Sequence, residues 1–241
     1  MRWAVRRSGA RRGGFALTEA IVAATLLLML VQVCWWVAAV QSMVGTRVAT
    51  GARILDETRL IHHVITAEVG QGRGGVDWTV ANGELHLRAF RGTAFRCHTQ
   101  PARGLAVSVS GYRAPDPSKD SVLVLSRDGA WRPAALVRRS RRGSLDCQKL
   151  AGFQAEVWYL DPPRADLLVA AYYERGAYRL SDGAFRYRRG NGGWQPLTGG
   201  GIMADSTKLV PAGPNGVSTV VTWREPGPLP SSFGWTSRGM R

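Results

Sequence analysis

An apolar segment, Ala20 to Val40, constrains the fold of this chain more than any other sequence feature. Thr25 and Gln32 are its only clearly polar residues. A helix rises about 1.5 Å per residue, so this segment covers roughly 30 Å, the thickness of the hydrocarbon core of a bilayer. A core helix of a soluble protein has a polar face, and this segment has none. It therefore predicts a membrane-spanning helix or the apolar region of a signal peptide.

The signal-peptide alternative fits less well. A secretory signal has a shorter apolar region that ends at a small-residue cleavage site. The segment here is longer, although Ala38-Ala39 before Gln41-Ser42 imitates such a site. Cleavage after the segment therefore stays open as the second alternative.

The charges around the apolar segment predict its orientation. Residues 1–14 hold five arginines and no acid, whereas only Arg47 and Arg53 follow the segment closely. Because positive residues stay on the cytoplasmic side, we expect a single-pass membrane protein. Its N-terminus would be cytoplasmic, and the chain from about residue 41 would be extracytoplasmic. The arginines of this leader are Arg2, Arg6, Arg7, Arg11 and Arg12.

Glu19 does not fit a plain membrane anchor. A carboxylate at membrane depth costs a few kcal/mol unless it has a partner. One explanation is an interfacial acid near a helix N-terminus, where the helix dipole favours negative charge. The other is a carboxylate that pairs with a cation, such as an amino terminus released by cleavage nearby.

The leader and Glu19 together form a recognisable motif. The sequence Arg12-Gly13-Gly14-Phe15-Ala16-Leu17-Thr18-Glu19 resembles the type III signal of type IV pilins and pseudopilins, with Ala16 and Thr18 at variable positions. The resemblance implies that a prepilin peptidase cleaves between Gly14 and Phe15 and that Phe15 is N-methylated. It also implies that Glu19 sets the register against the amino terminus of a neighbouring subunit during assembly, since a wrong register leaves both charges unpaired.

We expect the helix to continue past the apolar segment, with residues 15–40 in the membrane and residues 41–69 as an amphipathic half. Ile54, Ile61 and Ile65 recur near three- and four-residue spacing among charged residues, as in a helix packed on a globular domain. The glycine-rich residues 70–75 end it.

From residue 76 the pattern changes to short strands separated by turns. Residues 76–80 and 84–90 alternate on either side of Asn82-Gly83, a strong hairpin pattern. We therefore expect an α+β, pilin-like fold, with the long N-terminal helix packed on an antiparallel β-sheet domain at residues 70–224. Further strands are expected at Leu105–Tyr112, Ser121–Ser126, Phe153–Tyr159, Leu167–Glu174, Tyr178–Leu180, Ala184–Arg188 and Val217–Trp223, with turns that include Arg175-Gly176 and Asp182-Gly183.

Two segments are expected to lack regular structure. Residues 225–241 are rich in Pro, Gly and Ser and predict a flexible tail. Residues 138–144 predict an exposed basic loop. A weaker resemblance also exists: Ser121–Ser126 after Asp120, and the hairpin at 178–186, are similar to segments of larger minor pilins and J-type minor pseudopilins.

The sequence predicts no catalysis, because it contains no nucleophile elbow, zincin motif or phosphate-binding loop. We expect no enzyme activity, no cofactor and no metal. Cys97 and Cys147 both lie in the region expected outside the cytoplasm, where a disulfide is permitted, and free thiols are the alternative. Cys34 lies within the apolar segment and is expected to stay unpaired.

Basic residues suggest a second kind of function. The chain has a net charge of +15, of which the leader supplies five charges. Aromatic residues beside arginine suit single-stranded nucleic acid, and the local clusters are Arg138, Arg139, Arg141 and Arg142, and Tyr187 with Arg186, Arg188 and Arg189. A solvated basic surface is the simpler interpretation.

The expected function is therefore that of a minor pilin or pseudopilin, a structural subunit of a type IV pilus or a type II secretion pseudopilus. Its expected partners are a prepilin peptidase, other subunits of the filament and the inner membrane; nucleic acid is a less favoured partner. The alternative is a membrane-anchored extracytoplasmic module that binds DNA or another polyanion.

Overall fold

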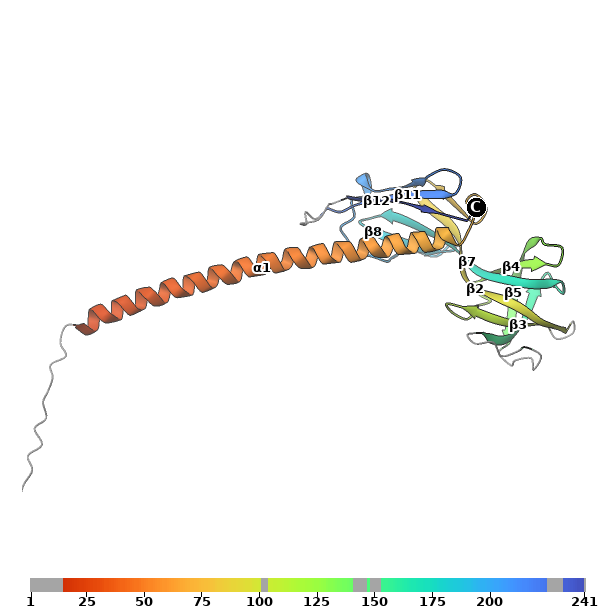
Figure 1. Ribbon diagram of the computed structural model, residues 1–241, viewed down its shortest axis with the longest axis horizontal. Coiled ribbons are helices and arrows are strands. Elements are labelled where there is room, and N and C mark those ends of the chain that lie inside the picture. Colours follow the sequence, from red (N-terminus) through yellow and green to blue (C-terminus); the bar gives the residue numbers. More distant parts are fainter. Residues whose placement is uncertain (1–14, 101–103, 141–146, 148–152, 225–231, 241) are drawn as a thin grey trace, which may run out of the picture. The chain divides into compact units, whose positions relative to one another are not determined.

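The computed structural model describes residues 15–100, 104–140, 147, 153–224 and 232–240. The chain divides into two compact units, Met1–Ala52 and Arg53–Arg241, and helix α1 (Phe15–Gly70) contributes to both. The strands are β1 (Trp78–Ala81), β2 (Glu84–Gln100), β3 (Gly104–Gly111), β4 (Ser121–Ser126), β5 (Trp131–Ser140), β6 (Gln154–Asp161), β7 (Leu167–Ser181), β8 (Ala184–Arg189), β9 (Gln195–Pro196), β10 (Lys208–Pro211), β11 (Gly216–Thr222) and β12 (Ser232–Arg238), with a short 3-10 helix η1 (Ala204–Ser206) before β10. This is the expected α+β class (Figure 1).

The described part of the first unit is helical throughout. Every large apolar side chain from Leu17 to Trp36 is at least 55% exposed within the unit, and the helix is long and apolar enough to cross a membrane. Residues 1–14, with the expected leader and Gly14, lie outside the described residues.

In the second unit, the rest of α1 packs into a hydrophobic core. Ile54, Ile61, Ile65 and Val69 are almost fully buried, which confirms the amphipathic pattern from Ile54 onward. They contact side chains of two antiparallel sheets. The first sheet supplies Leu85, Leu87, Tyr178 and Phe185, and the second, with strand order β10-β11-β12, supplies Leu209, Val217 and Val221.

The larger sheet contains a closed barrel. Its strand order is β1-β2-β3-β6-β5-β4-β7-β8-β9, and β2 also pairs with β7. This last pairing closes β2-β3-β6-β5-β4-β7 into a six-stranded antiparallel barrel. The barrel interior is a second hydrophobic core, with Trp158 and Tyr172 as its largest fully buried side chains. Residues between the middle of β2 and the middle of β7 thus form a module inserted into one long hairpin.

A bulge marks the point where β2 enters the barrel. The pairing of β2 with β7 shifts register between Phe90 and Gly92, which leaves Arg91 as the extra residue. Gly92 then lies opposite Gly111 on β3 and opposite Tyr172 on β7. A Cβ on either glycine would collide with the Tyr172 hydroxyl, so the barrel closes only because both positions lack a side chain.

Several local expectations are confirmed. The hairpin at Asn82-Gly83 joins β1 and β2, with positive φ at both turn residues. Asp182-Gly183 has the same geometry between β7 and β8. The strand expected at Ser121–Ser126 is β4.

The expected turn at Arg175-Gly176 is wrong. Leu167–Ser181 forms one continuous strand, because β2 pairs with it on one side and β8 pairs with its second half on the other. Gly176 is needed for packing and not for a turn, because a Cβ at this position would lie 2.6 Å from the ring of Tyr187. The glycine accommodates a close aromatic contact within the sheet.

Two expectations of irregular structure also need correction. The flexible tail is wrong for Ser232–Arg238, which forms β12 and pairs with β11 along its whole length. Phe233 and Trp235 on this strand pack against the core, and their partial burial offsets the poor strand propensity of Gly234 between them. The expected basic loop begins inside a strand, since Arg138 and Arg139 belong to β5; residues 141–144 lie outside the described residues.

Candidate functional site

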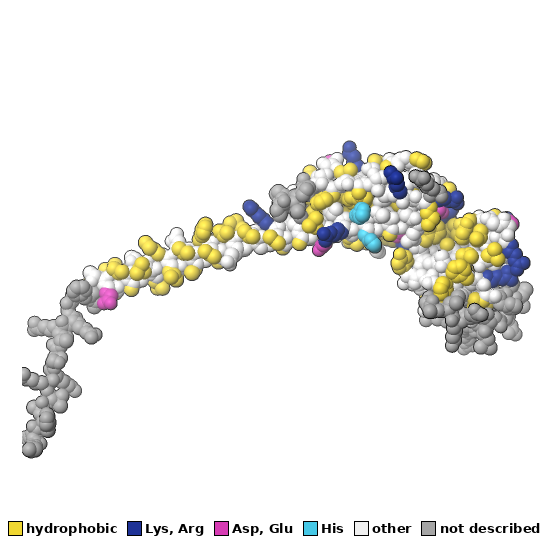
Figure 2. Space-filling model, viewed as in Figure 1, with side chains coloured by type: hydrophobic (Ala, Val, Ile, Leu, Met, Phe, Trp, Pro, Cys, Tyr) yellow, Lys and Arg dark blue, Asp and Glu magenta, His cyan; other side chains and the backbone are white. Residues whose placement is uncertain are grey.

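The first candidate site is the apolar surface of α1 in the first unit. Phe15 is the first residue of the helix, and Glu19 is exposed one turn later. Figure 2 shows hydrophobic side chains along the visible face of this part of the helix, and the large apolar side chains from Leu17 to Trp36 are all exposed. Within the described residues no hydrogen bond or ion pair reaches Glu19. An apolar surface on all sides is stable only against lipid or against other apolar helices.

The second half of α1 is fixed to the β domain by polar contacts as well as by its buried isoleucines. Trp223 Nε1 donates a hydrogen bond to Thr58 Oγ1 at 3.0 Å. The hydroxyls of Thr66 and Ser237 lie 2.9 Å apart, which connects the helix to β12. This half of the helix is therefore an integral part of the β domain.

A network of charged residues joins the end of α1 to the sheet at the β2 bulge. Arg91 donates from Nη1 to Glu68 Oε1 on α1 at 2.9 Å and from Nη2 to Glu174 Oε1 on β7 at 2.8 Å. The side chains of all three residues are no more than 16% exposed. The hydroxyls of Tyr178 and Tyr187 donate to Glu68 and Glu174 at 3.1 and 2.8 Å.

The network extends to the loop between β3 and β4. Arg113 forms a bidentate pair with the fully buried carboxylate of Asp120, both N–O distances being 2.6 Å, and its Nη2 lies 3.3 Å from Glu174 Oε2. The Tyr172 hydroxyl donates to the Arg113 carbonyl. These contacts connect the helix, the long hairpin and the barrel at one point.

Burial and hydrogen bonds set the protonation of this network. Burial raises the pKa of Glu174, but hydrogen bonds from Arg91 and Tyr187 outweigh it and hold the pKa below its usual value. Burial also raises the pKa values of Tyr178 and Tyr187, so both stay protonated and act as donors. We interpret the network as structural, because every member has a partner within it.

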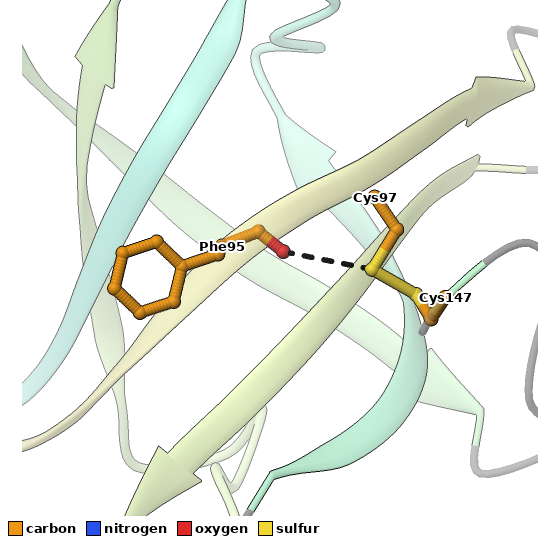
Figure 3. The surroundings of a disulfide bond; sticks show 3 residues. All are labelled: Phe95, Cys97 and Cys147. Atoms are coloured by element: carbon orange, nitrogen blue, oxygen red, sulfur yellow. Dashed lines mark hydrogen bonds between the residues drawn. A yellow bond between two sulfur atoms is a disulfide. The ribbon is translucent and has the colours of Figure 1, made fainter. Parts of the chain in front are cut away.

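The structure joins Cys97 and Cys147 by a disulfide, the pair that the sequence offered for one. Cys97 lies on β2 in the barrel, and the bond ties it to the connection between β5 and β6 (Figure 3). The carbonyl oxygen of Phe95 lies 3.9 Å from Cys97 Sγ. Cys34 is free and exposed on α1.

Among the described residues no group of three or more His, Cys, Asp or Glu is arranged to hold a metal.

Two residues of the basic clusters expected from the sequence, Tyr187 and Arg139, are engaged inside the fold. Tyr187 is partly buried and packs against the core, where the centroid of its ring lies 4.8 Å from that of Tyr178 and its hydroxyl donates to Glu174. Arg139 pairs with the buried carboxylate of Glu156 at 2.7 Å. Arg138 lies over the ring of Tyr159, and residues 141 and 142 lie outside the described residues.

One outer face of the barrel is apolar. By strand register, Phe95 on β2, Val169 on β7, Leu125 on β4 and Trp131 on β5 form a continuous row across four strands. Phe95 and Trp131 are 42% and 46% exposed. An exposed apolar row of this length marks a surface available for contact with another molecule.

Sequence reasoning found the residues of α1 and the cysteines, but it missed the charged network and this apolar row. Their members come from distant elements, and no spacing in the sequence indicates that they meet.

No protein-family model, no curated protein and no solved structure matches the chain. The physical arrangement and the N-terminal motif are therefore the basis for a functional assignment.

Proposed function

We propose that this chain is a minor subunit of a type IV filament machine, either a type IV pilus or a type II secretion pseudopilus. In this proposal a prepilin peptidase removes residues 1–14, Phe15 becomes the methylated amino terminus, and the β domain is carried outside the inner membrane. The subunit has no catalytic role. It acts by inserting its helix among those of neighbouring subunits.

One observation carries the proposal. A single helix of 56 residues, Phe15–Gly70, exposes an apolar surface in the first unit and is built into the core of the β domain in the second. A simple anchor requires only about 20 apolar residues. A helix shared between an apolar environment and a folded domain instead suits a subunit that must hold its domain at a set position relative to neighbouring helices.

The position of Glu19 supports the same proposal. It lies one turn after Phe15, so a neighbouring amino terminus at this depth would give its carboxylate a partner. In an apolar bundle the two charges stabilise one register, because any other register leaves each of them unpaired. This contact would select the correct axial position of the subunit.

Mass spectrometry of the chain produced together with a prepilin peptidase tests the processing step. We expect a chain that starts at N-methylated Phe15. Gly14→Val should remain uncut because a branched side chain replaces the glycine before the cleavage point, whereas Gly13→Ala should be cut normally. A wild-type chain that keeps Met1, or that starts near Gln41, would falsify the proposal.

Assembly is tested separately with Glu19→Gln. This variant should still be cleaved, but disulfide-independent crosslinking to other filament subunits in the membrane should fall at least tenfold. Asp56→Asn, an exposed acid of the same helix, serves as the matched control and should crosslink normally. Equal crosslinking by Glu19→Gln and wild type would show that Glu19 has no part in assembly.

A further inference from the structure

An array of arginines covers the outer face of the sheet in the second unit, on the side opposite α1. Leu85, Leu87, Tyr178 and Phe185 point into the core with the helix. Because side chains alternate along a strand, their neighbours point to the other side. The arginine face, as we call it, consists of His86 and Arg88 on β2, Arg175 and Arg179 on β7, and Arg186 and Arg188 on β8.

The arginine face brings like charges directly opposite each other. Arg88 lies across from Arg175 in the β2–β7 pair, and Arg179 lies across from Arg186 in the β7–β8 pair. Such pairs destabilise a sheet unless an anion lies near them. Asp182 lies 3.7 Å from Arg179 and 3.5 Å from Arg186. Asp77 pairs with Arg88, whereas Arg175 is exposed and has no such neighbour among the described residues.

The carboxylates beside the arginine face do not neutralise it. Glu84 is the one acid within it, and it lies 3.5 to 3.6 Å from Arg188 and Arg179. Asp77 pairs with Arg88 at 3.1 Å, and Asp182, at the turn, lies 3.5 Å from Arg186 and is 66% exposed. Five arginines and His86 therefore meet three carboxylates, and an exposed pair such as Arg186–Asp182 contributes little.

Trp194 lies against this array. Its ring is 4.2 Å from the Arg179 guanidinium carbon and 4.6 Å from that of Arg188. Cation–π contacts at these distances hold the indole and the two side chains in place. The Nε atoms of both arginines are buried and have no hydrogen-bond partner.

We infer that the arginine face binds the phosphodiester backbone of a single-stranded nucleic acid. A guanidinium fork matches the geometry of a phosphate better than an ammonium does, and rows of cations beside an aromatic ring are how proteins bind single strands without reading sequence. The face lies on the side of the sheet opposite the part of α1 that belongs to the second unit. The inference does not depend on the proposed filament role.

The test uses the full chain in nonionic detergent and a fluorescein-labelled 30-nucleotide DNA strand, with anisotropy measured at several salt concentrations. The first variant carries Arg88→Gln, Arg175→Gln and Arg186→Gln. The matched control carries Arg59→Gln, Arg127→Gln and Arg132→Gln, which removes the same charge from other surfaces. The leader arginines are common to all three chains.

The face variant should bind the strand about tenfold more weakly than wild type, and the control variant less than threefold. Loss of three phosphate contacts should also lower the slope of log affinity against log salt by about 2. Arg175→Gln alone, which breaks no ion pair, should weaken binding about threefold, so the test does not depend on the folding of the triple variant.

Three results would overturn the inference. One is an equal loss in the face and control variants, which would indicate general charge attraction. Another is tighter binding of a sulfated polysaccharide of the same charge than of the DNA strand. The third is no binding of the strand by the wild-type chain at 50 mM salt. At this low salt concentration about five phosphate contacts should give strong binding.

Discussion

Arg91 Nη1 lies 2.9 Å from Glu68 Oε1, so the residue that bulges out of β2 is paired with the last turns of α1. The same side chain donates to Glu174 from Nε and Nη2 at 3.0 and 2.8 Å. One guanidinium therefore pairs with two carboxylates that the fold removes from water. The contact also places the entrance of the barrel at a fixed point on the helix.

Arg91→Met should destabilise the protein by about 3 kcal/mol, because it leaves two buried carboxylates without their main cation. Urea unfolding of the full chain in detergent measures this change. Arg96→Met is the matched control on the same strand. Among the described residues Arg96 donates to the Ala165 carbonyl alone, at 3.0 Å, and its loss should lower the free energy of unfolding by less than 1 kcal/mol. Equal effects of the two substitutions would contradict the role of Arg91 as the main cation of the two buried carboxylates.

The lowered pKa of Glu174 predicts how stability depends on pH. A carboxylate whose pKa is lower in the folded state stabilises the fold fully above its ordinary value of 4.5. As pH falls below that value toward the folded pKa, the contribution is lost. Unfolding midpoints of wild type and Glu174→Gln should therefore converge between about pH 5 and pH 3 and differ most at pH 7. A constant difference across this range would show that Glu174 does not titrate differently in the two states.

The local features of the fold could be predicted from sequence because each depends on residues close together in the chain. The spacing of Ile54, Ile61 and Ile65 indicated a helix face, and Asn82-Gly83 indicated a hairpin. The turn wrongly expected at Gly176 shows the limit of such reasoning. A glycine suits both a turn and a close contact, and only the distant Tyr187 decides between them.

The closed barrel and the charged network could not be predicted in the same way. Barrel closure depends on the pairing of β2 with β7, whose residues Phe95 and Val169 are far apart in the chain. Arg91 reaches Glu68 and Glu174 because a bulge redirects its side chain. Gly92 beside it is compatible with a bulge, but it does not indicate which partners the redirected side chain meets. Pairing across long separations is set by the complete core, which a local pattern does not contain.

Loss of the Cys97–Cys147 disulfide should weaken the barrel more than the helix. The bond closes a loop with a sequence separation of 50 residues, for which chain entropy gives a stabilisation of about 4 kcal/mol. Cys97→Ser with Cys147→Ser should lower the free energy of unfolding by roughly 3 kcal/mol and reduce amide protection in β3, β5 and β6. Protection of α1 from Ile54 to Val69 should change less.

Cys34→Ser provides the control for the disulfide prediction, because Cys34 is free and lies in the first unit. Without reductant, the free energy of unfolding of this variant should match that of wild type. Addition of reductant should then lower the stability of both chains equally and leave the double serine variant unchanged. A reductant effect on the double variant would mean that another bond is involved.

Removal of β12 should destabilise the β domain, because this strand is part of the second sheet and not a flexible tail. A chain that ends at Arg224 loses the pairing with β11 and the packing of Phe233 and Trp235 against the core. Trp235 also contacts His62 of α1, with ring centroids 5.2 Å apart. Trp235→Ala alone should lower the free energy of unfolding by about 2 kcal/mol, since truncation of a half-buried side chain costs less than truncation of a fully buried one. Met240→Ala, at a position that is 57% exposed, is the matched control and should change it by less than 0.5 kcal/mol. Thermal unfolding of the truncated chain at or near the wild-type midpoint would show that β12 adds nothing to stability.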